Sequence, residues 1–257
     1  PIIQHGEVDF RDPRRDHEHG RIWRITKKDS PLLKHPPIAK ASIEDLIEIL
    51  RKPEQRNRIN AKRERRTRDQ EEVMTALEQT LANMKPTEAD FETARLEILW
   101  AFQTLDIVNK DLLDTLLGSK DHHVSAAAVR ILSEWKSRLD NEAANIYTLT
   151  ETVQDPHPRV RLEAIRALAR LKTPKATETA MLAMDFELDK FVDYALWTTM
   201  RDLKDDWIGE VNNLDFAKDN EKLLFALKAI DSHEAVAPLL EAYQNEALTP
   251  RQQPATL

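Results

Sequence analysis

Val160-Arg-Leu-Glu-Ala-Ile-Arg-Ala-Leu-Ala-Arg-Leu171 is the most regular of three stretches that share one helical pattern. The two earlier ones are Ala94-Arg-Leu-Glu-Ile-Leu-Trp-Ala-Phe-Gln-Thr-Leu105 and Val124-Ser-Ala-Ala-Ala-Val-Arg-Ile-Leu132. Their starting positions are separated by steps of 30 and 36 residues, and such a period is typical of stacked helical arrays. The sequence therefore predicts an all-α fold, an α-α superhelix or solenoid.

The apolar side chains of the third stretch explain why such helices stack. Its apolar stripe consists of Val160, Ala164, Leu168 and Leu171. The small Ala in the middle lets a neighbouring helix approach to about 8–10 Å. One helix pair cannot bury both of its apolar sides, so each pair needs another above and below it. We expect a superhelix in which one row of helices lines a concave surface.

Local signals place the helix boundaries. Ser42 is a good N-cap with acidic residues in the first turn after it, and Gly118 occupies a position typical of a helix C′ residue. We expect helices after Ser42, at 56–69 and 71–84, and then at 88–106, 110–117, 121–138, 142–154, 157–172, 174–185, 188–204, 220–230 and 233–245. Where the spacing loosens, we expect a longer loop pinned by Trp207, Leu214 and Phe216.

The first forty residues differ from the rest. Residues 1–40 are polar and punctuated by Pro and Gly, so we expect an extended segment, the end of a preceding domain, before a helical repeat domain at 41–257. Residues 21–26 alternate and are rich in β-formers, which predicts one short strand. The densest cluster of candidate metal ligands combines nearby carboxylates with His5, His17 and His19. We interpret this cluster as a solvated loop, with metal binding as the alternative.

The composition excludes several kinds of site and partner for this chain. The few glycines, 4 in all, favour helices. The absence of cysteine excludes disulfides, thiolate catalysis, Cys-ligated zinc and a Cys-x-x-Cys-His haem attachment within these residues. No apolar run of 18 residues is present, so no membrane span is predicted. The net charge of -7 divides into +6 over residues 1–70 and -13 over residues 71–257. The acidic part would repel a nucleic-acid backbone, so no nucleic-acid partner is expected.

Aligning the repeats yields a row of candidate partner-binding residues. The equivalent position beside the buried stripe holds Trp100, Arg130, Arg166 and Trp197, with Tyr194 one helical turn before the last. Trp, Tyr and Arg are common interface anchors, and Arg over Trp would add roughly 0.5–1 kcal/mol where partly exposed. We hypothesise that this row binds a protein partner. The alternative is that the tryptophans fill gaps between repeats and the arginines pair with Glu163 or Glu134.

A degenerate copy of the repeat lies near the start and aligns Ala61 with Ala164. Asn57 and Arg65 replace its apolar positions, and we interpret it as a terminal cap with a polar outer face. The run 51–68 holds nine basic residues and two acidic ones. We interpret this run as the solvated face of a capping helix. Phosphate binding is the alternative, although no aromatic residue interleaves to stack on bases.

Several stretches together carry a family resemblance. They are His5-Gly-Glu-Val-Asp-Phe10 through His19-Gly-Arg-Ile-Trp-Arg-Ile-Thr26, Ala61-Lys-Arg-Glu64, Leu96-Glu-Ile-Leu-Trp-Ala-Phe-Gln-Thr-Leu105, Ala126-Ala-Ala-Val-Arg-Ile-Leu132, Val160 to Leu168 and Asp193-Tyr-Ala-Leu-Trp197. The first stretch resembles the end of the β-propeller, and the others the HEAT-repeat region, of large exported proteins of planctomycetes and Bacteroidetes. These are called membrane-bound dehydrogenases, or haem-binding proteins with a Cys-x-x-Cys-His motif. The resemblance implies a sugar-dehydrogenase-like propeller before the repeats, a c-type cytochrome module after them, and a periplasmic or cell-surface location.

The predicted function is a non-catalytic helical-repeat scaffold that mediates protein-protein or inter-domain contacts. The resemblance implies that the chain is a fragment of a larger exported redox protein, and that its partner is a protein or a neighbouring domain. No catalytic, cofactor-binding or metal-binding residue is assigned. One alternative is a HEAT-type nucleic-acid-binding protein or DNA glycosylase, which needs a basic concave groove. Another is a chromophore lyase of HEAT type.

Overall fold

The computed structural model describes residues 34–139, 142–230 and 233–238, with a few others among the first 33 and at 240. The chain divides into two compact units, Pro1–His35 and Pro36–Leu257, and the second contains the helices described below. The histidines of the expected metal cluster, His5, His17 and His19, lie outside the described residues. So do residues 21–24 of the expected strand, while Ile25 and Thr26 are described and belong to no strand.

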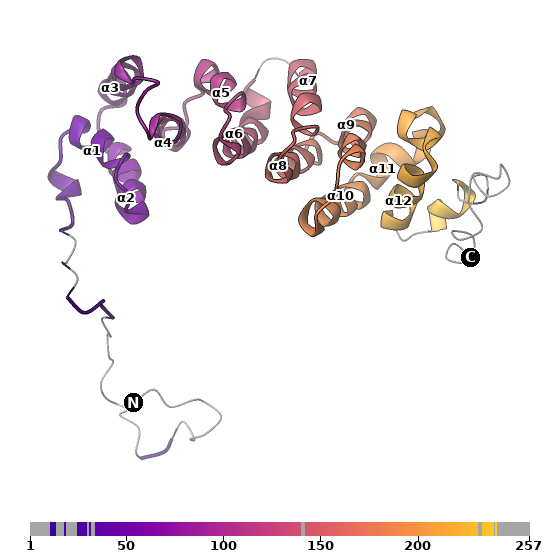
Figure 1. Ribbon diagram of the computed structural model, residues 1–257, viewed down its shortest axis with the longest axis horizontal. Coiled ribbons are helices and arrows are strands. Elements are labelled where there is room, and N and C mark those ends of the chain that lie inside the picture. The colour runs from indigo at the N-terminus through magenta and orange to yellow at the C-terminus, as the bar shows by residue number, and fades with distance from the viewer. Residues whose placement is uncertain are drawn as a thin grey trace. The chain divides into compact units, whose positions relative to one another are not determined.

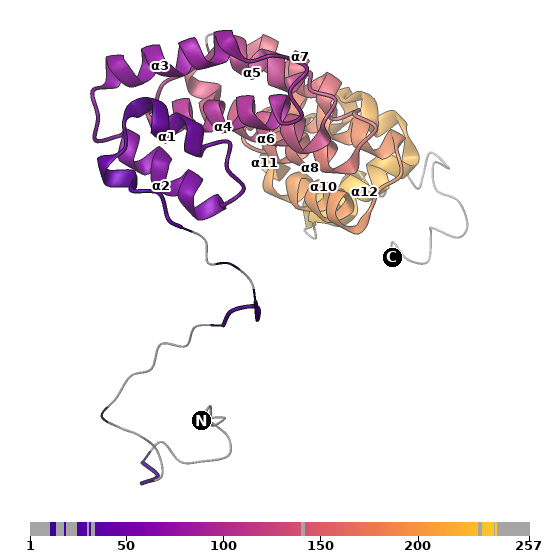
Figure 2. The same ribbon diagram turned by 60° about the vertical axis from the view of Figure 1, so that its left-hand side comes forward.

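The helical unit is built from consecutive helix pairs that stack in two rows (Figure 1, Figure 2). The inner row consists of α2 (Gln55–Arg65), α4 (Phe91–Thr104), α6 (His122–Trp135), α8 (Pro158–Leu168), α10 (Lys190–Asp202) and α12 (Asn220–Ile230). The outer row consists of α1 (Ile43–Ile49), α3 (Gln70–Asn83), α5 (Lys110–Leu117), α7 (Glu142–Thr152), α9 (Pro174–Ala180) and α11 (Lys204–Trp207). Each inner helix packs against the next one, and within this unit Figure 1 shows that row along the lower, concave side. The predicted α-α superhelix is confirmed.

Side-chain caps fix where the helices begin. Ser42 and Asp45 form a capping box at α1, because the Ser42 hydroxyl accepts a hydrogen bond from the Asp45 amide at 3.1 Å and the Asp45 carboxylate accepts one from the Ser42 amide at 3.4 Å. Asp121 and Asp189 accept backbone hydrogen bonds at the starts of α6 and α10. Pro158 opens α8, where its missing N–H costs no helical hydrogen bond. The predicted N-cap at Ser42 is therefore confirmed.

The buried stripes of the inner helices join into one apolar core. Val160, Ala164 and Leu168 are fully buried in α8, as the repeat pattern predicts. Full burial of a side chain of the size of Val or Leu contributes about 1.5–3 kcal/mol, and the small Ala leaves room for α6 and α10 on either side of α8. Leu171, expected on the same stripe, follows the end of α8 and is only partly buried.

Two helices are followed, within four residues of their ends, by a residue in the left-handed conformation. Asp106 follows α4 with φ 59, and Lys172 follows α8 with φ 54. These two residues hold equivalent repeat positions, eight residues after Ile98 and Ala164 respectively. Gly118 follows α5 as expected, but its φ of -86 is an ordinary one. The conformational freedom of glycine is therefore not used there.

The segment after α10 is helical rather than a loop. It contains α11 and two 3-10 turns, Ile208–Asn213 and Asp215–Lys218. The residues expected to pin it are buried: Trp207, Leu214 and Phe216. The Trp207 indole donates to the Met200 carbonyl oxygen at 2.9 Å and meets the Phe216 ring edge-on. The anchors were predicted correctly, and the helical turns between them were missed.

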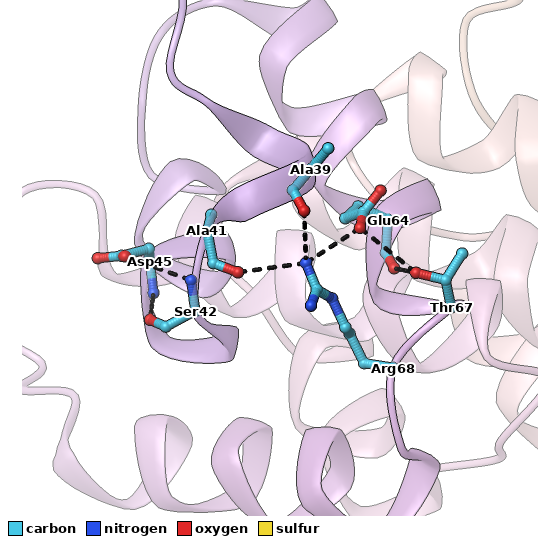
Figure 3. Close-up of polar contacts among 7 residues, drawn as sticks. All are labelled: Ala39, Ala41, Ser42, Asp45, Glu64, Thr67 and Arg68. Carbon is cyan, nitrogen blue, oxygen red and sulfur yellow. Dashed lines mark hydrogen bonds and ion pairs between the residues drawn. The ribbon is translucent and has the colours of Figure 1, made fainter.

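Arg68 ties the start of the helical unit to the end of α2 (Figure 3). Its Nη2 donates to the carbonyl oxygens of Ala39 at 3.1 Å and Ala41 at 3.3 Å. The same nitrogen lies 3.0 Å from the carboxylate of Glu64. These contacts hold the 3-10 turn Ile38–Lys40 against α2.

The polar residues of the first repeat copy lie inside the stack. Asn57 and Arg65 are buried in α2, so the interpretation of them as part of a polar outer face is wrong. Arg58 of this copy matches Arg161 of the third copy. Each Nη1 donates to the carbonyl oxygens five and six residues earlier in the chain. This shared contact supports the alignment of the two copies.

Candidate functional site

The predicted row of partner-binding residues lies along consecutive inner helices. They are Trp100 on α4, Arg130 on α6, Arg166 on α8, and Tyr194 and Trp197 on α10. Each of these helices packs against the next. The two arginines and the tyrosine are exposed, and the two tryptophans are partly buried. The structure thus brings the predicted residues to successive positions of one row.

The cations that face the tryptophans are not the ones that the sequence suggested. Lys62 Nζ lies 5.0 Å from the centre of the Trp100 ring. The guanidinium carbon of Arg201 lies 5.0 Å from the centre of the Trp197 ring. The expectation that the arginines of the row stack over the tryptophans is wrong, because a buried carboxylate holds both of these arginines.

That carboxylate belongs to Glu163 on α8, and three arginines converge on it. Arg130 reaches across from α6 and donates to Oε1 at 2.5 Å and to Oε2 at 3.3 Å. Arg159 Nη2 lies 3.2 Å from Oε1, and Arg166 Nη1 lies 3.7 Å from Oε2. The hydrogen bonds to Glu163 raise the pKa of Arg130. The pairing of the row's arginines with Glu163, which was the alternative interpretation, is therefore present.

Glu97 on α4 is the centre of a second cluster of cations. Its Oε1 lies 2.8 Å from Arg58 Nε, and its Oε2 lies 2.5 Å from Lys62 Nζ. Arg65 is buried nearby, and its two terminal nitrogens have no hydrogen-bond partner. Burial lowers the pKa of Arg65 to about 10, although the charge of Glu97 acts in the opposite direction. This cluster joins α2 to α4.

Exposure distinguishes the two clusters. The side chains of Arg58 and Lys62 at Glu97 are 23% and 13% exposed. At Glu163 the cations are about half exposed: Arg130 50%, Arg159 49% and Arg166 57%. The Glu97 cluster is therefore closed between its helices, whereas the Glu163 cluster presents guanidinium donors to solvent.

Two adjoining cavities surround the Glu163 cluster, and both are lined by Arg130 and Glu163. The smaller, of about 190 Å³, lies between α6 and α8 and is also lined by Ser133, Glu134, Arg166, Ala167 and Arg170. The larger, of about 500 Å³, extends to α4 and is also lined by Trp100, His122, His123, Ala126, Ala127, His157 and Arg159. We call the two cavities together the Glu163 trough.

The stacking of His122 on His157 at the larger cavity was missed by the sequence reasoning. The rings of His122 and His157 stack with their centres 3.6 Å apart. Partial burial, followed by the nearby His123 and His157, lowers the pKa of His122. A signal was available, since 35 residues separate His122 from His157, close to one repeat. Asp121, His122 and His123 place ligand atoms within 4.8 Å of one another, but Asp121 already accepts a hydrogen bond from the His123 amide as a cap.

An aromatic patch lies on α10, the inner helix that packs against α8. Phe191 and Tyr194 of α10 are 61% and 67% exposed. The Tyr194 ring stacks on that of Trp197, with their centres 6.2 Å apart. Large exposed aromatic side chains on one helix are typical of contact surfaces.

Charge separates the two rows of helices. The inner helices carry 14 Lys and Arg against 8 Asp and Glu, a balance of +6. The outer helices carry 3 against 13, a balance of -10. Of the +6 of the inner row, +4 belongs to α2, which precedes residue 70. The five inner helices after residue 70 carry 9 Lys and Arg against 7 Asp and Glu, a balance of +2, so the acidic balance of that part of the chain does not come from its inner helices. The sequence argument against a nucleic-acid partner used the net charge of the whole stretch after residue 70, whereas the fold places the acidic excess of the helices on the outer row.

Comparison with known proteins supports a HEAT-repeat region. A family model for HEAT repeats matches residues 109–192, from the start of α5 into α10. Neither the curated proteins nor the solved structures gave a significant match. Within the described part of the chain, no helix has the length and apolar character needed to cross a membrane. The fold is a HEAT-like helical-repeat scaffold, a class that typically mediates protein interactions, and the resemblance to exported dehydrogenases stays a prediction.

Proposed function

We propose that this chain is a non-catalytic scaffold whose inner row of helices holds a partner protein or a neighbouring domain of the same polypeptide. One observation carries the proposal: the exposed aromatic residues of α10 and the solvent-facing arginines of the Glu163 trough lie on neighbouring helices of the inner row. Aromatic residues and arginine are enriched at interfaces and supply most hot spots. A stack of helix pairs offers them on one extended surface.

The candidate site holds binding groups rather than a reacting constellation. The carboxylate of Glu163 is engaged by three arginines, so it is not placed to take a proton from a substrate. The carboxylate of Asp121 is used as a helix cap. What remains accessible is a set of guanidinium donors, imidazoles and aromatic faces, which suit recognition.

The setting that we propose is a larger exported redox protein, at the periplasm or cell surface. This step rests on the resemblance of the first 26 residues to a propeller end and of the repeats to the region that follows it. The full coding sequence tests it. We expect a β-propeller before Pro1 and a cytochrome module with a Cys-x-x-Cys-His motif after Leu257, and two unrelated flanking domains would overturn this part of the proposal.

A photo-crosslinking pair tests the scaffold itself. Tyr194 on α10 and Tyr147 on α7 are almost equally exposed, at 67% and 68%, but they lie on the inner and the outer row. A photoreactive phenylalanine analogue is placed at one or the other position in the full-length protein in its own cells. We expect protein crosslinks, within or between chains, from position 194 and not from position 147. Equal yields at the two positions would contradict the proposal.

A nucleic-acid-binding function is the second candidate, because the inner row is basic. Neutralising several phosphates makes the affinity fall steeply with salt. Asp121 and Asp189, however, sit at the starts of two inner helices, where they would face a continuous phosphate backbone. Binding of a single-stranded or duplex oligonucleotide with a steep negative salt slope would favour this function over the first.

A further inference from the structure

We propose that the Glu163 trough binds an acidic peptide segment of the partner, an inference that rests on the proposed scaffold function and names the chemistry of what it holds. The trough contains four arginines, Arg130, Arg159, Arg166 and Arg170, against two glutamates, Glu134 and Glu163. Its balance is thus +2. A carboxylate-bearing ligand is the complement of such a surface.

Glu163 positions three arginines of the trough before a ligand binds. It is buried and holds Arg130, Arg159 and Arg166 by one carboxylate, so these long side chains are partly ordered before a ligand arrives. Each guanidinium carries five donors in a fixed fork, and one carboxylate cannot use all the donors of three arginines. These side chains line the trough and are about half exposed, so the unused donors remain accessible to a ligand. Ordering them in advance lowers the entropic cost of binding a second carboxylate.

The larger cavity supplies an apolar site beside the cationic one. Trp100, Ala126 and Ala127 contribute apolar surface to its lining, while Arg130 and Arg159 line the same cavity. A volume of about 500 Å³ accommodates one or two side chains of a bound segment. The ligand that fits is therefore an extended peptide that alternates acidic with apolar residues. A small inorganic anion would leave the apolar part unused.

The same geometry favours a peptide over a nucleic acid. Glu134 and Glu163 line the trough, and Asp121 and Asp155 lie at the turns before α6 and α8. A nucleic acid carries a charge at every phosphate and would meet these carboxylates. A peptide places neutral residues opposite them and acidic ones opposite the arginines.

Fluorescence anisotropy with defined probes tests the inference. The purified chain is titrated with a labelled peptide of repeated Glu-Glu-Leu, with the Gln-Gln-Leu peptide of the same length, and with a single-stranded oligonucleotide. We expect the acidic peptide to bind most tightly. The double substitution Arg166→Gln and Arg170→Gln should weaken it about fivefold, since each exposed pair contributes roughly 0.5 kcal/mol.

Two matched controls remove the same charge elsewhere. Lys110→Gln with Lys175→Gln changes the outer row, on α5 and α9, and Arg63→Gln with Arg66→Gln changes the inner row at the end of α2. We expect both pairs to bind the acidic peptide within about twofold of the unchanged chain. Circular dichroism melting shows that each variant is folded.

Three results would overturn the inference. They are equal affinity for the acidic and neutral peptides, tighter binding of the oligonucleotide, and an equal loss of affinity in either control pair. If any of these occurs while position 194 still crosslinks to a protein, the scaffold function stands and only the acidic-peptide chemistry fails. If position 194 gives no crosslinks, the scaffold function itself fails.

Discussion

At the scale of single residues, two buried glutamates each hold a cluster of cations between helices of the inner row. Glu97 locks α2 to α4 with cations that are mostly covered, and Glu163 joins α6 to α8 with cations that are half exposed. The sequence aligns these glutamates at one repeat position. It does not reveal which of the two clusters has covered cations, because that depends on the side chains of the neighbouring helices. The contrast makes the two residues a matched pair for mutagenesis.

Removing each carboxylate should have unequal effects on stability. Glu97→Gln leaves the covered charges of Arg58 and Lys62 without a partner, and we expect it to lower the free energy of unfolding by about 3 kcal/mol. Glu163→Gln leaves arginines that water reaches, so we expect a loss of about 1.5 kcal/mol. Denaturant unfolding of the two variants measures both values. A larger loss for Glu163→Gln would show that the assignment of covered and open clusters is reversed.

Arg65 is a buried cation whose terminal nitrogens lack hydrogen-bond partners, and its replacement should stabilise the protein. Leu168 holds the equivalent position in the third repeat copy and is fully buried. We therefore expect Arg65→Leu to raise the free energy of unfolding by about 1–3 kcal/mol, because it removes an unpaired buried charge. Thermal melting compares this variant with Arg63→Gln on the exposed side of α2, which should stay unchanged. A destabilised Arg65→Leu would mean that the guanidinium has a partner that this account lacks.

His122 should titrate below the ordinary histidine pKa of 6.5, for which partial burial is the first cause and the neighbouring histidines the next. The unfolded chain then binds the proton more tightly, so this group reduces stability as the pH falls through about 6.5. NMR titration of the His122 ring gives the midpoint directly. We expect His157→Gln to move it upward, because one repelling imidazole is removed. A midpoint that His157→Gln leaves in place would contradict the stacked pair.

At the scale of elements, the helices and their stacking order could be predicted because the apolar period of each stretch is regular. The start of α1 was visible at Ser42, because its side chain caps the helix locally. The ends were less visible, because the left-handed residues that follow α4 and α8 are Asp106 and Lys172 rather than glycines, and Gly118, which the sequence marks as a C′ residue, has an ordinary φ. The helical turns around Trp207 were also missed, since they depend on tertiary packing of that ring rather than on a repeating pattern.

The left-handed residue after α8 yields a test at this scale. Lys172 has φ 54, a conformation that costs a residue with a Cβ about 1 kcal/mol relative to glycine. We expect Lys172→Gly to stabilise the protein by about that amount. Gly118 is the control, because its φ is -86 and an added Cβ would meet only the Thr115 carbonyl oxygen at 3.7 Å. Gly118→Ala should therefore leave the free energy of unfolding unchanged or raise it slightly. A strong loss of stability in this variant would show that position 118 needs a glycine, which contradicts its ordinary φ.

At the scale of the whole helical unit, the separation of charge is the feature that the sequence hid. The chain alternates outer and inner helices, so the average over residues 71–257 mixes a balance of -7 in the outer helices with one of +2 in the inner helices. The row of Trp100, Arg130, Arg166 and Trp197 was found because its spacing follows the repeat. The Glu163 trough was not, since its cavities form only when α4, α6 and α8 stand side by side.

The central claim is that the inner row is the contact surface, and thiol protection tests it most directly. The chain has no cysteine, so single cysteines report without background from these residues: Tyr194→Cys and Arg166→Cys on the inner row, Tyr147→Cys and Lys110→Cys on the outer row. Each is labelled with a thiol reagent as purified chain and as full-length protein in its own cells. The account predicts several-fold slower labelling in cells at 194 and 166 and unchanged labelling at 147 and 110. Equal rates at all four positions, or protection of the outer pair alone, would contradict it.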